Sequence, residues 1–315
     1  MGWPMAFNLR SKLGPEKTIL ISDVSEDAIA RYLKETEGKG PVKIVKNGFD
    51  AVQQADMVVT MLPTSPAVKA VYLDPNTGIL AGVKKAAETS KINKIIMECG
   101  TIETATILSV NEATNQTASA LPSGSTVTFV DAPVSGGPMG AEAGTLTFMV
   151  GANDKSVFPL VRDVLQHMGN KDGIFLCGDV GAGTAFKVIN NYLSAITSLA
   201  ASEAMNIGAK MNLDLKLLTD VINASGGQCW VTSKSSPVPG IHANAPASRG
   251  YEGGFRIELC KKVLQMGTDL GQMVGARTIL DKPTLAAFEE AAADPRYAGK
   301  DARVVYKWLN ESENK

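Results

Sequence analysis

The order of short apolar runs in the first 178 residues constrains the fold most strongly. Residues 18–23, 56–62, 95–99 and 126–130 are rich in β-branched and other apolar side chains, which is typical of buried strands. Stretches with a helical pattern separate these runs. Strands that alternate with helices form parallel βαβ units, so we predict an α/β fold with a doubly wound Rossmann-type sheet.

The pattern changes after residue 178. Residues 184–211 are rich in apolar side chains and contain no proline, which predicts one helix roughly 40 Å long at about 1.5 Å per residue. Shorter helical patterns follow up to residue 310. We therefore expect a Rossmann-type domain at residues 1–178 and an all-helical domain at 179–315. The long apolar helix also favours a homodimer or homotetramer.

Composition excludes several classes of function. The chain has 31 basic and 32 acidic residues, so it has no excess of positive charge with which to bind nucleic acid. Its apolar runs are too short to span a bilayer. With four scattered cysteines, no C-x-x-C pair and two histidines, neither a disulfide framework nor a metal site is expected.

A dinucleotide site can be placed near the start of the sequence. Residues 1–9 open a helix, and Gly2 stands where a glycine-rich phosphate loop would end. The strand at 18–23 ends at Asp23, about 20 residues on, where a carboxylate would accept hydrogen bonds from ribose hydroxyls. The same carboxylate would repel a 2′-phosphate, which favours NAD over NADP. The alternative is that Asp23 is a solvated residue at the end of a strand.

Two further motifs predict binding of a small anionic substrate and transfer of a proton. Ser135, Gly136 and Gly137 follow a strand, and successive glycine amides beside a hydroxyl can bind a carboxylate, although an ordinary turn has the same pattern. Lys187 lies in the first turns of the long helix, one turn before Asn191. Burial would lower its pKa and let the amine exchange a proton with an alcohol. The alternative is a surface lysine.

Taken in order, these segments resemble the β-hydroxyacid dehydrogenase family, and within it the hydroxyisobutyrate branch. They extend from Met1-Gly2-x-Pro4-Met5-Ala6-x-Asn8-Leu9 to Gly253-Gly254-Phe255 and so span nearly the whole chain. The other matching segments are residues 60–65, 131–137, 144–151, 181–191, 229–230 and 237–240.

The resemblance implies an NAD-dependent oxidation of 3-hydroxyisobutyrate to methylmalonate semialdehyde, a step of valine degradation in the mitochondrial matrix. A cytoplasmic location is the alternative, because no targeting peptide is visible in the sequence. It implies that Lys187 is the general acid/base. Ser135, Gly136 and Gly137 would bind the substrate carboxylate, and Asn191 would help to fix the substrate. The residues that would contact the cofactor are Gly2, Asp23, Leu62, Pro63, Thr101 and Lys262.

The chain departs from the family pattern at three places. Only Met1 and Gly2 represent the glycine loop, so we expect a truncated chain whose sheet lacks its first strand. Val263 stands where the family has an acidic residue after Lys262, so any role of that carboxylate is lost. Ala67 stands where the family has asparagine, which removes one hydrogen bond to the cofactor.

Two other functions compete with this interpretation. One is an NADPH-dependent reductase of glyoxylate or succinic semialdehyde from the same superfamily, against which Asp23 argues. The other is a non-catalytic dimerising protein that has lost cofactor binding, an alternative that rests on the incomplete glycine loop. Titration with NADH and NADPH separates the three.

Overall fold

The strands form two sheets in this structure, a computed structural model that describes residues 1–311. β1 and β2 pair in parallel, while the larger sheet has the order β3-β4-β5-β7-β6, with β8 also beside β7. Within the described residues no strand joins the two sheets. The strands are β1 (Ile19–Ile21), β2 (Val42–Ile44), β3 (Met57–Thr60), β4 (Asn93–Glu98), β5 (Thr126–Asp131), β6 (Val134–Ser135), β7 (Leu146–Ala152) and β8 (Gly169–Gly178).

Strand direction agrees with the prediction in one part of the large sheet and not in another. β3, β4 and β5 are parallel, with Val59 opposite Met97 and Met97 opposite Val130. β7 is antiparallel to both β5 and β6, so the expectation of parallel strands throughout is wrong here. About ten residues connect β6 to β7, fewer than a parallel crossover needs. The carboxyl ends of β3, β4 and β5 nevertheless meet at one edge, where the predicted cofactor segments begin.

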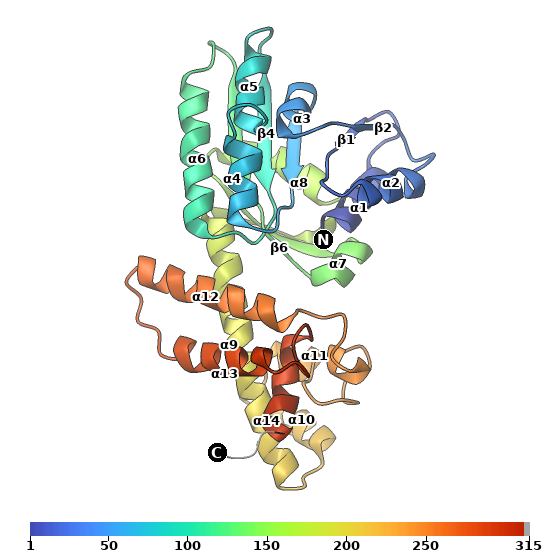
Figure 1. The fold of residues 1–315 in the computed structure, drawn as a ribbon, viewed down its shortest axis with the longest axis vertical. Coiled ribbons are helices and arrows are strands. Elements are labelled where there is room, and N and C mark those ends of the chain that lie inside the picture. The colour runs from blue at the N-terminus through green and yellow to red at the C-terminus, as the bar shows by residue number, and fades with distance from the viewer. Residues whose placement is uncertain (312–315) are drawn as a thin grey trace. The chain divides into compact units, whose positions relative to one another are not determined.

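Helices cover both faces of the large sheet in the first unit (Figure 1). On one face Val52, Ile79 and Ile107 pack on Ile96, while on the other Val161 of α8 belongs to a second apolar core. The continuous apolar runs of β4 and β5 follow from this burial, because these two strands are covered on both sides. The helices of this unit before α9 are α1 (Gly2–Lys12), α2 (Glu26–Glu35), α3 (Gly48–Gln54), α4 (Ser65–Leu73), α5 (Ile79–Ala87), α6 (Thr104–Ser119), α7 (Gly137–Ala143) and α8 (Phe158–Leu165).

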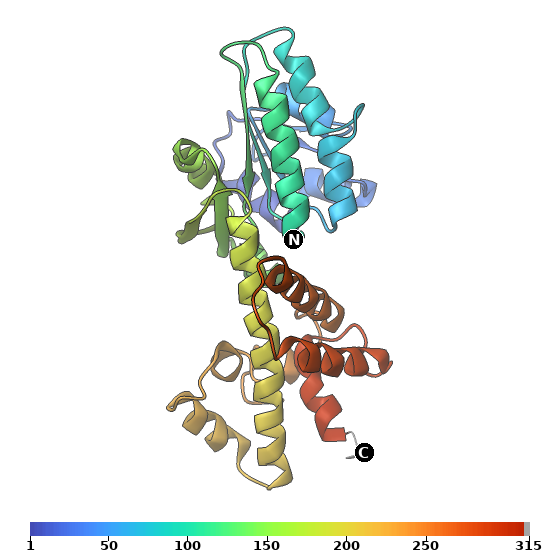
Figure 2. The same ribbon diagram turned by 90° about the vertical axis from the view of Figure 1, so that its left-hand side faces the viewer.

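The predicted long helix is present as α9 (Ala182–Lys210), drawn in yellow in Figure 2. The chain divides into two compact units, Met1–Lys187 and Val188–Lys315, so the division falls inside α9, whereas the predicted boundary lies just before it. In the second unit no strand occurs up to residue 311, and no helix of the described chain is long and apolar enough to cross a membrane. Its other α-helices are α10 (Leu215–Asn223), α11 (Trp230–Lys234), α12 (Ile257–Met273), α13 (Asp281–Ala293) and α14 (Val305–Glu311).

The contact between α3 and α5 depends on a glycine. A Cβ added to Gly82 of α5 would lie 2.5 Å from the carbonyl oxygen of Phe49 and 2.6 Å from Cγ1 of Val52. Real side-chain carbons do not approach other atoms so closely, and protein interiors are packed too densely to yield easily. The two helices therefore lie this close only because residue 82 has no side chain.

We expect Gly82→Ala to lower the free energy of unfolding by about 1–3 kcal/mol, because overpacking outweighs the ~1 kcal/mol that alanine contributes within a helix. Urea unfolding followed by circular dichroism measures the change. Gly140→Ala is the matched control, since a Cβ there would lie 3.5 Å from Leu146, an ordinary contact. Equal stability of the Gly82→Ala variant and the unaltered chain would contradict this packing argument.

Candidate active site

The segments predicted to hold the cofactor adjoin one another at the carboxyl ends of β3 and β4. A Cβ on Gly2, the first residue of α1, would lie 3.6 Å from the Cβ of Met61. A Cβ on Gly100 would overlap the carbonyl oxygen of Leu62. The start of α1, the loop after β3 and the loop after β4 therefore form one continuous surface, and Thr101 follows directly on it.

This surface fits the pyrophosphate of a dinucleotide. No acidic side chain lies in the first turn of α1 and no side chain caps its start, so its amides are left to an anion. Leu62 is half-buried and Pro63 is exposed beside it. Bound at this surface, NAD would be held by Gly2, Leu62, Pro63 and Thr101.

A buried carboxylate that was not among the predicted site residues fixes both loops. Oε1 of Glu98 accepts hydrogen bonds from the amides of Gly100 (2.7 Å) and Leu62 (3.3 Å). Oε2 accepts one from the hydroxyl of Thr60 (2.5 Å), which also lies 2.6 Å from the hydroxyl of Tyr72. Burial raises the pKa of Glu98, and these hydrogen bonds oppose the rise. The signal in the sequence is an acidic residue at the end of an otherwise apolar strand.

Asp23 has a local structural task in addition to any role toward a ribose. It lies just after β1 and is exposed, and its Oδ1 accepts a hydrogen bond from the amide of Ser25 (2.9 Å). Ser25 in turn caps α2. The hydroxyl of Tyr32 on α2 donates to the carbonyl of Ala6 on α1 (3.0 Å), so the Asp23 turn is tied to the helix that begins at Gly2. Its contact with a ribose stays a prediction.

The predicted carboxylate site is a turn that only glycine can form. Ser135 ends β6, and Gly136 and Gly137 have φ values of 132° and 63°, which strain any residue with a side chain. Both glycines are exposed and Ser135 is half-buried, so the turn is open to a ligand. The amide of Asn8 on α1 donates to the carbonyl of Ala141 at the end of α7 (2.8 Å), which ties the turn to the cofactor helix.

Lys187 is buried, which excludes the alternative of a surface lysine. It lies in the second turn of α9 and only 8% of its surface is exposed. Among residues 1–311 it makes no ion pair and no hydrogen bond, and desolvation lowers its pKa from 10.5 to about 8. A minor fraction of this amine is therefore neutral near pH 7, and the neutral form can accept a proton.

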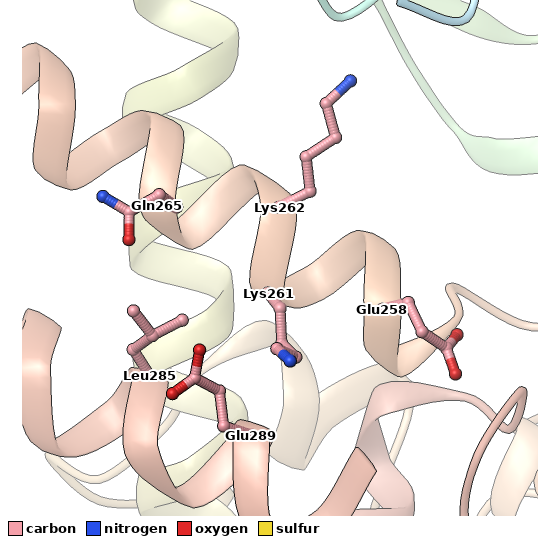
Figure 3. Close-up of a pocket in the computed structure, with 6 residues that line it drawn as sticks. All are labelled: Glu258, Lys261, Lys262, Gln265, Leu285 and Glu289. Atoms are coloured by element: carbon pink, nitrogen blue, oxygen red, sulfur yellow. The ribbon is translucent and has the colours of Figure 1, made fainter. Parts of the chain in front are cut away.

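Asn191 and Lys262 belong to the second unit. Asn191 is half-buried on α9, four residues after Lys187. Lys262 lies on α12 and extends away from Leu285 and Glu289 of α13, as Figure 3 shows. Val263, which replaces an acidic residue of the family pattern, is buried against Val188 and Met266. This packing favours an apolar residue at position 263. The roles of Asn191 and Lys262 stay predictions.

The chain is similar to known proteins over nearly its whole length. Residues 1–181 match the family described as the NAD binding domain of 6-phosphogluconate dehydrogenase, and residues 181–309 that described as the NAD-binding of NADP-dependent 3-hydroxyisobutyrate dehydrogenase. Mitochondrial 3-hydroxyisobutyrate dehydrogenase of Homo sapiens is 34% identical over 313 residues, 99% of this chain and 85% of that protein. NAD-dependent L-serine dehydrogenase of Pseudomonas aeruginosa is 33% identical over 99% of this chain and 96% of its own length.

A solved structure leads to the same class. The 3-hydroxyisobutyrate dehydrogenase of Mycobacterium tuberculosis with L-serine has a TM-score of 0.82 and 31% identity, and the match covers 98% of this chain and 95% of that one. Fold and site thus define an oxidoreductase that uses NAD, of the β-hydroxyacid dehydrogenase class. The chain belongs to the 3-hydroxyisobutyrate dehydrogenase family, which confirms the resemblance found in its motifs.

The burial of Lys187 has a consequence for stability that depends on pH. Below pH 8 the amine is protonated in the folded and the unfolded chain, and burying its charge costs roughly 3 kcal/mol at about 1.4 kcal/mol per pKa unit. Between pH 8 and pH 10.5 the unfolded chain binds more protons than the folded one, so this group makes stability rise with pH. Above that window the cost is gone.

We therefore expect Lys187→Met to raise the free energy of unfolding by about 2–3 kcal/mol at pH 7, with the gain shrinking toward pH 10. Urea unfolding at several pH values measures this. Lys155→Met, at an exposed lysine of the same unit, is the control and should show no such gain. A Lys187→Met variant no more stable than the unaltered chain at pH 7 would mean that the amine is not desolvated.

Proposed function

We propose that this chain oxidises 3-hydroxyisobutyrate to methylmalonate semialdehyde with NAD, as a step of valine degradation. The observation that carries the proposal is the buried amine of Lys187, whose pKa of about 8 suits proton exchange with an alcohol near neutral pH. The human relative that bears this substrate in its name supports the choice of acid.

Different residues would bind the substrate and accept its proton. The amides of Gly136 and Gly137 and the hydroxyl of Ser135 would hold the substrate carboxylate, which fixes one end of the molecule and so orients the carbinol. The neutral amine of Lys187 would accept the hydroxyl proton while the C–H bond breaks and the carbonyl forms. Bound NAD supplies the acceptor for the hydride. In the reverse direction the protonated amine would donate to the aldehyde oxygen.

L-Serine is the second candidate substrate. One relative is named an NAD-dependent L-serine dehydrogenase, and the similar M. tuberculosis structure has L-serine in its name. L-Serine is also a small acid with a hydroxyl on the β-carbon, so the same turn and the same amine would serve it. The NADPH-dependent reductase alternative requires a site that accepts a 2′-phosphate, which the carboxylate of Asp23 opposes.

Reduction of NAD followed by absorbance tests these proposals. We expect turnover with 3-hydroxyisobutyrate, and a kcat/KM for it above that for L-serine. A higher kcat/KM for L-serine would favour L-serine as the substrate. Failure to bind NADH in a fluorescence titration would leave only the non-catalytic alternative, and preference for NADPH would favour the reductases.

Exposed apolar side chains on α9 favour self-association. Ile189, Leu193 and Ile207 are 58%, 60% and 62% exposed. Residues four and 18 positions apart on a helix share one face, since about 18 residues make five turns. An apolar stripe of this kind fits burial against a second copy of the chain, so we propose a homodimer or homotetramer, which light scattering would detect.

We also propose the mitochondrial matrix as the compartment of this protein, because the human relative is named as mitochondrial.

Replacing the amine of Lys187 should abolish proton transfer and leave the cofactor site intact. We expect Lys187→Ala to lower kcat by about 10²–10⁴-fold, the usual contribution of a general acid or base, with an unchanged Kd for NADH. In the unaltered enzyme, kcat/KM for oxidation should rise as pH passes through about 8. Retention of turnover by Lys187→Ala would overturn the proton-transfer role.

The preference for NAD should depend on the charge of Asp23. We expect Asp23→Ser to reduce discrimination against NADP by about 10-fold or more, because the repulsion of a 2′-phosphate is lost while a hydroxyl remains to accept from Ser25. The ratio of kcat/KM for the two cofactors measures this. Asp74→Ser, at a carboxylate that likewise caps a turn, is the control and should leave the ratio unchanged. An unaltered ratio in Asp23→Ser would contradict the ribose role.

A further inference from the structure

Asp131 is a buried carboxylate to which the proposed mechanism gives no task. It is the last residue of β5 and has no exposed surface. The chain reaches Ser135, which begins the carboxylate-binding turn, only four residues later. Burial raises the pKa of Asp131, although hydrogen bonds from backbone amides oppose the rise. Burying a carboxylate costs free energy unless hydrogen bonds compensate, so the partners of Asp131 indicate its role.

The carboxylate of Asp131 holds the beginning of α9. Oδ1 accepts a hydrogen bond from the amide of Gly181 (2.8 Å), and Oδ2 accepts one from the amide of Thr184 (2.7 Å). The first amides of a helix have no partner within the helix, and a carboxylate is among the strongest partners they can find. Thr184 lies three residues before Lys187, so Asp131 holds the first turn of α9, directly before the turn that carries the amine.

Two glycines make room for this contact. A Cβ on Gly183 would overlap the carbonyl oxygen of Met149 and lie 3.0 Å from Oδ2 of Asp131. A Cβ on Gly151 would overlap Oδ1 of the same carboxylate. The two segments with these glycines, residues 144–151 and 181–191, are among the motifs that identify the family. Their glycines are thus explained by the close approach of β7 and α9 to Asp131.

We propose that Asp131 is the positioning residue for Lys187: it fixes the first turn of α9 to the end of β5, and so fixes the amine relative to the turn of Ser135, Gly136 and Gly137. The proposal rests on the proposed dehydrogenase function. A proton acceptor must stay within hydrogen-bond reach of the substrate hydroxyl, and an error of about 1 Å can lower the rate about 100-fold. The bound carboxylate of the substrate and the amine are then held by two segments that meet at one side chain.

Asp131→Asn and Asp131→Ala test the proposal, because neither side chain can accept hydrogen bonds from both amides. We expect kcat for oxidation to fall about 10- to 100-fold, while the Kd for NADH stays within about twofold of the original, since the cofactor loops after β3 and β4 are not held by Asp131. Hydrogen exchange at the amides of residues 181–187 should become faster. Asp154→Ala, which removes a carboxylate that caps a short 3-10 helix in the same unit, is the matched control and should change neither kcat nor this exchange.

The outcomes separate this proposal from the function on which it rests. Loss of turnover in Lys187→Ala together with normal kcat in both Asp131 variants would overturn the positioning role alone. Normal turnover in Lys187→Ala would overturn the proposed function and the positioning role with it. If neither Asp131 variant folds well enough to bind NADH, the carboxylate is needed for folding, and that result also contradicts a specific role in positioning the amine.

Discussion

The desolvated amine of Lys187 is the constraint on which the other features of the site depend. A lysine so deeply buried, with no counter-ion among the described residues, is kept at a cost in free energy. Such a cost is characteristic of functional sites, where a pKa near the working pH is worth more than stability. The long helix that carries it, the glycines around its first turn and the buried Asp131 all serve to place that one nitrogen atom.

A buried carboxylate also holds the loops of the cofactor site. Glu98 lies at the end of β4 and Asp131 at the end of β5, and each buried carboxylate accepts hydrogen bonds from amides beyond its own strand. Parallel strands bring their carboxyl ends to one edge, where loops diverge and need to be held. Carboxylates suit this task because each oxygen can accept from a backbone amide in the absence of water.

Much of this could be predicted from the sequence, because local patterns determine it. The apolar runs of β3, β4 and β5 and the proline-free stretch of α9 have the correct boundaries to within a few residues. The antiparallel direction of β7 could not be predicted, since it depends on the pairing of strands that a short connection joins. Strand β8 was also missed, because Gly169–Gly178 combines glycine and charged residues with a short apolar run. The partners of Glu98 and Asp131 lie up to 53 positions away in the sequence, which no local pattern specifies.

The most direct test of the central claim is a measurement of the pKa of Lys187 in the folded enzyme. The rate at which acetic anhydride labels this amine, followed by mass spectrometry of the peptide that contains it as pH is varied, reports the fraction that is neutral. The structure predicts a midpoint at about pH 8. A midpoint near 10.5, the ordinary value for lysine, would show that the amine is in water, and Lys187 would then not be the proton acceptor near neutral pH.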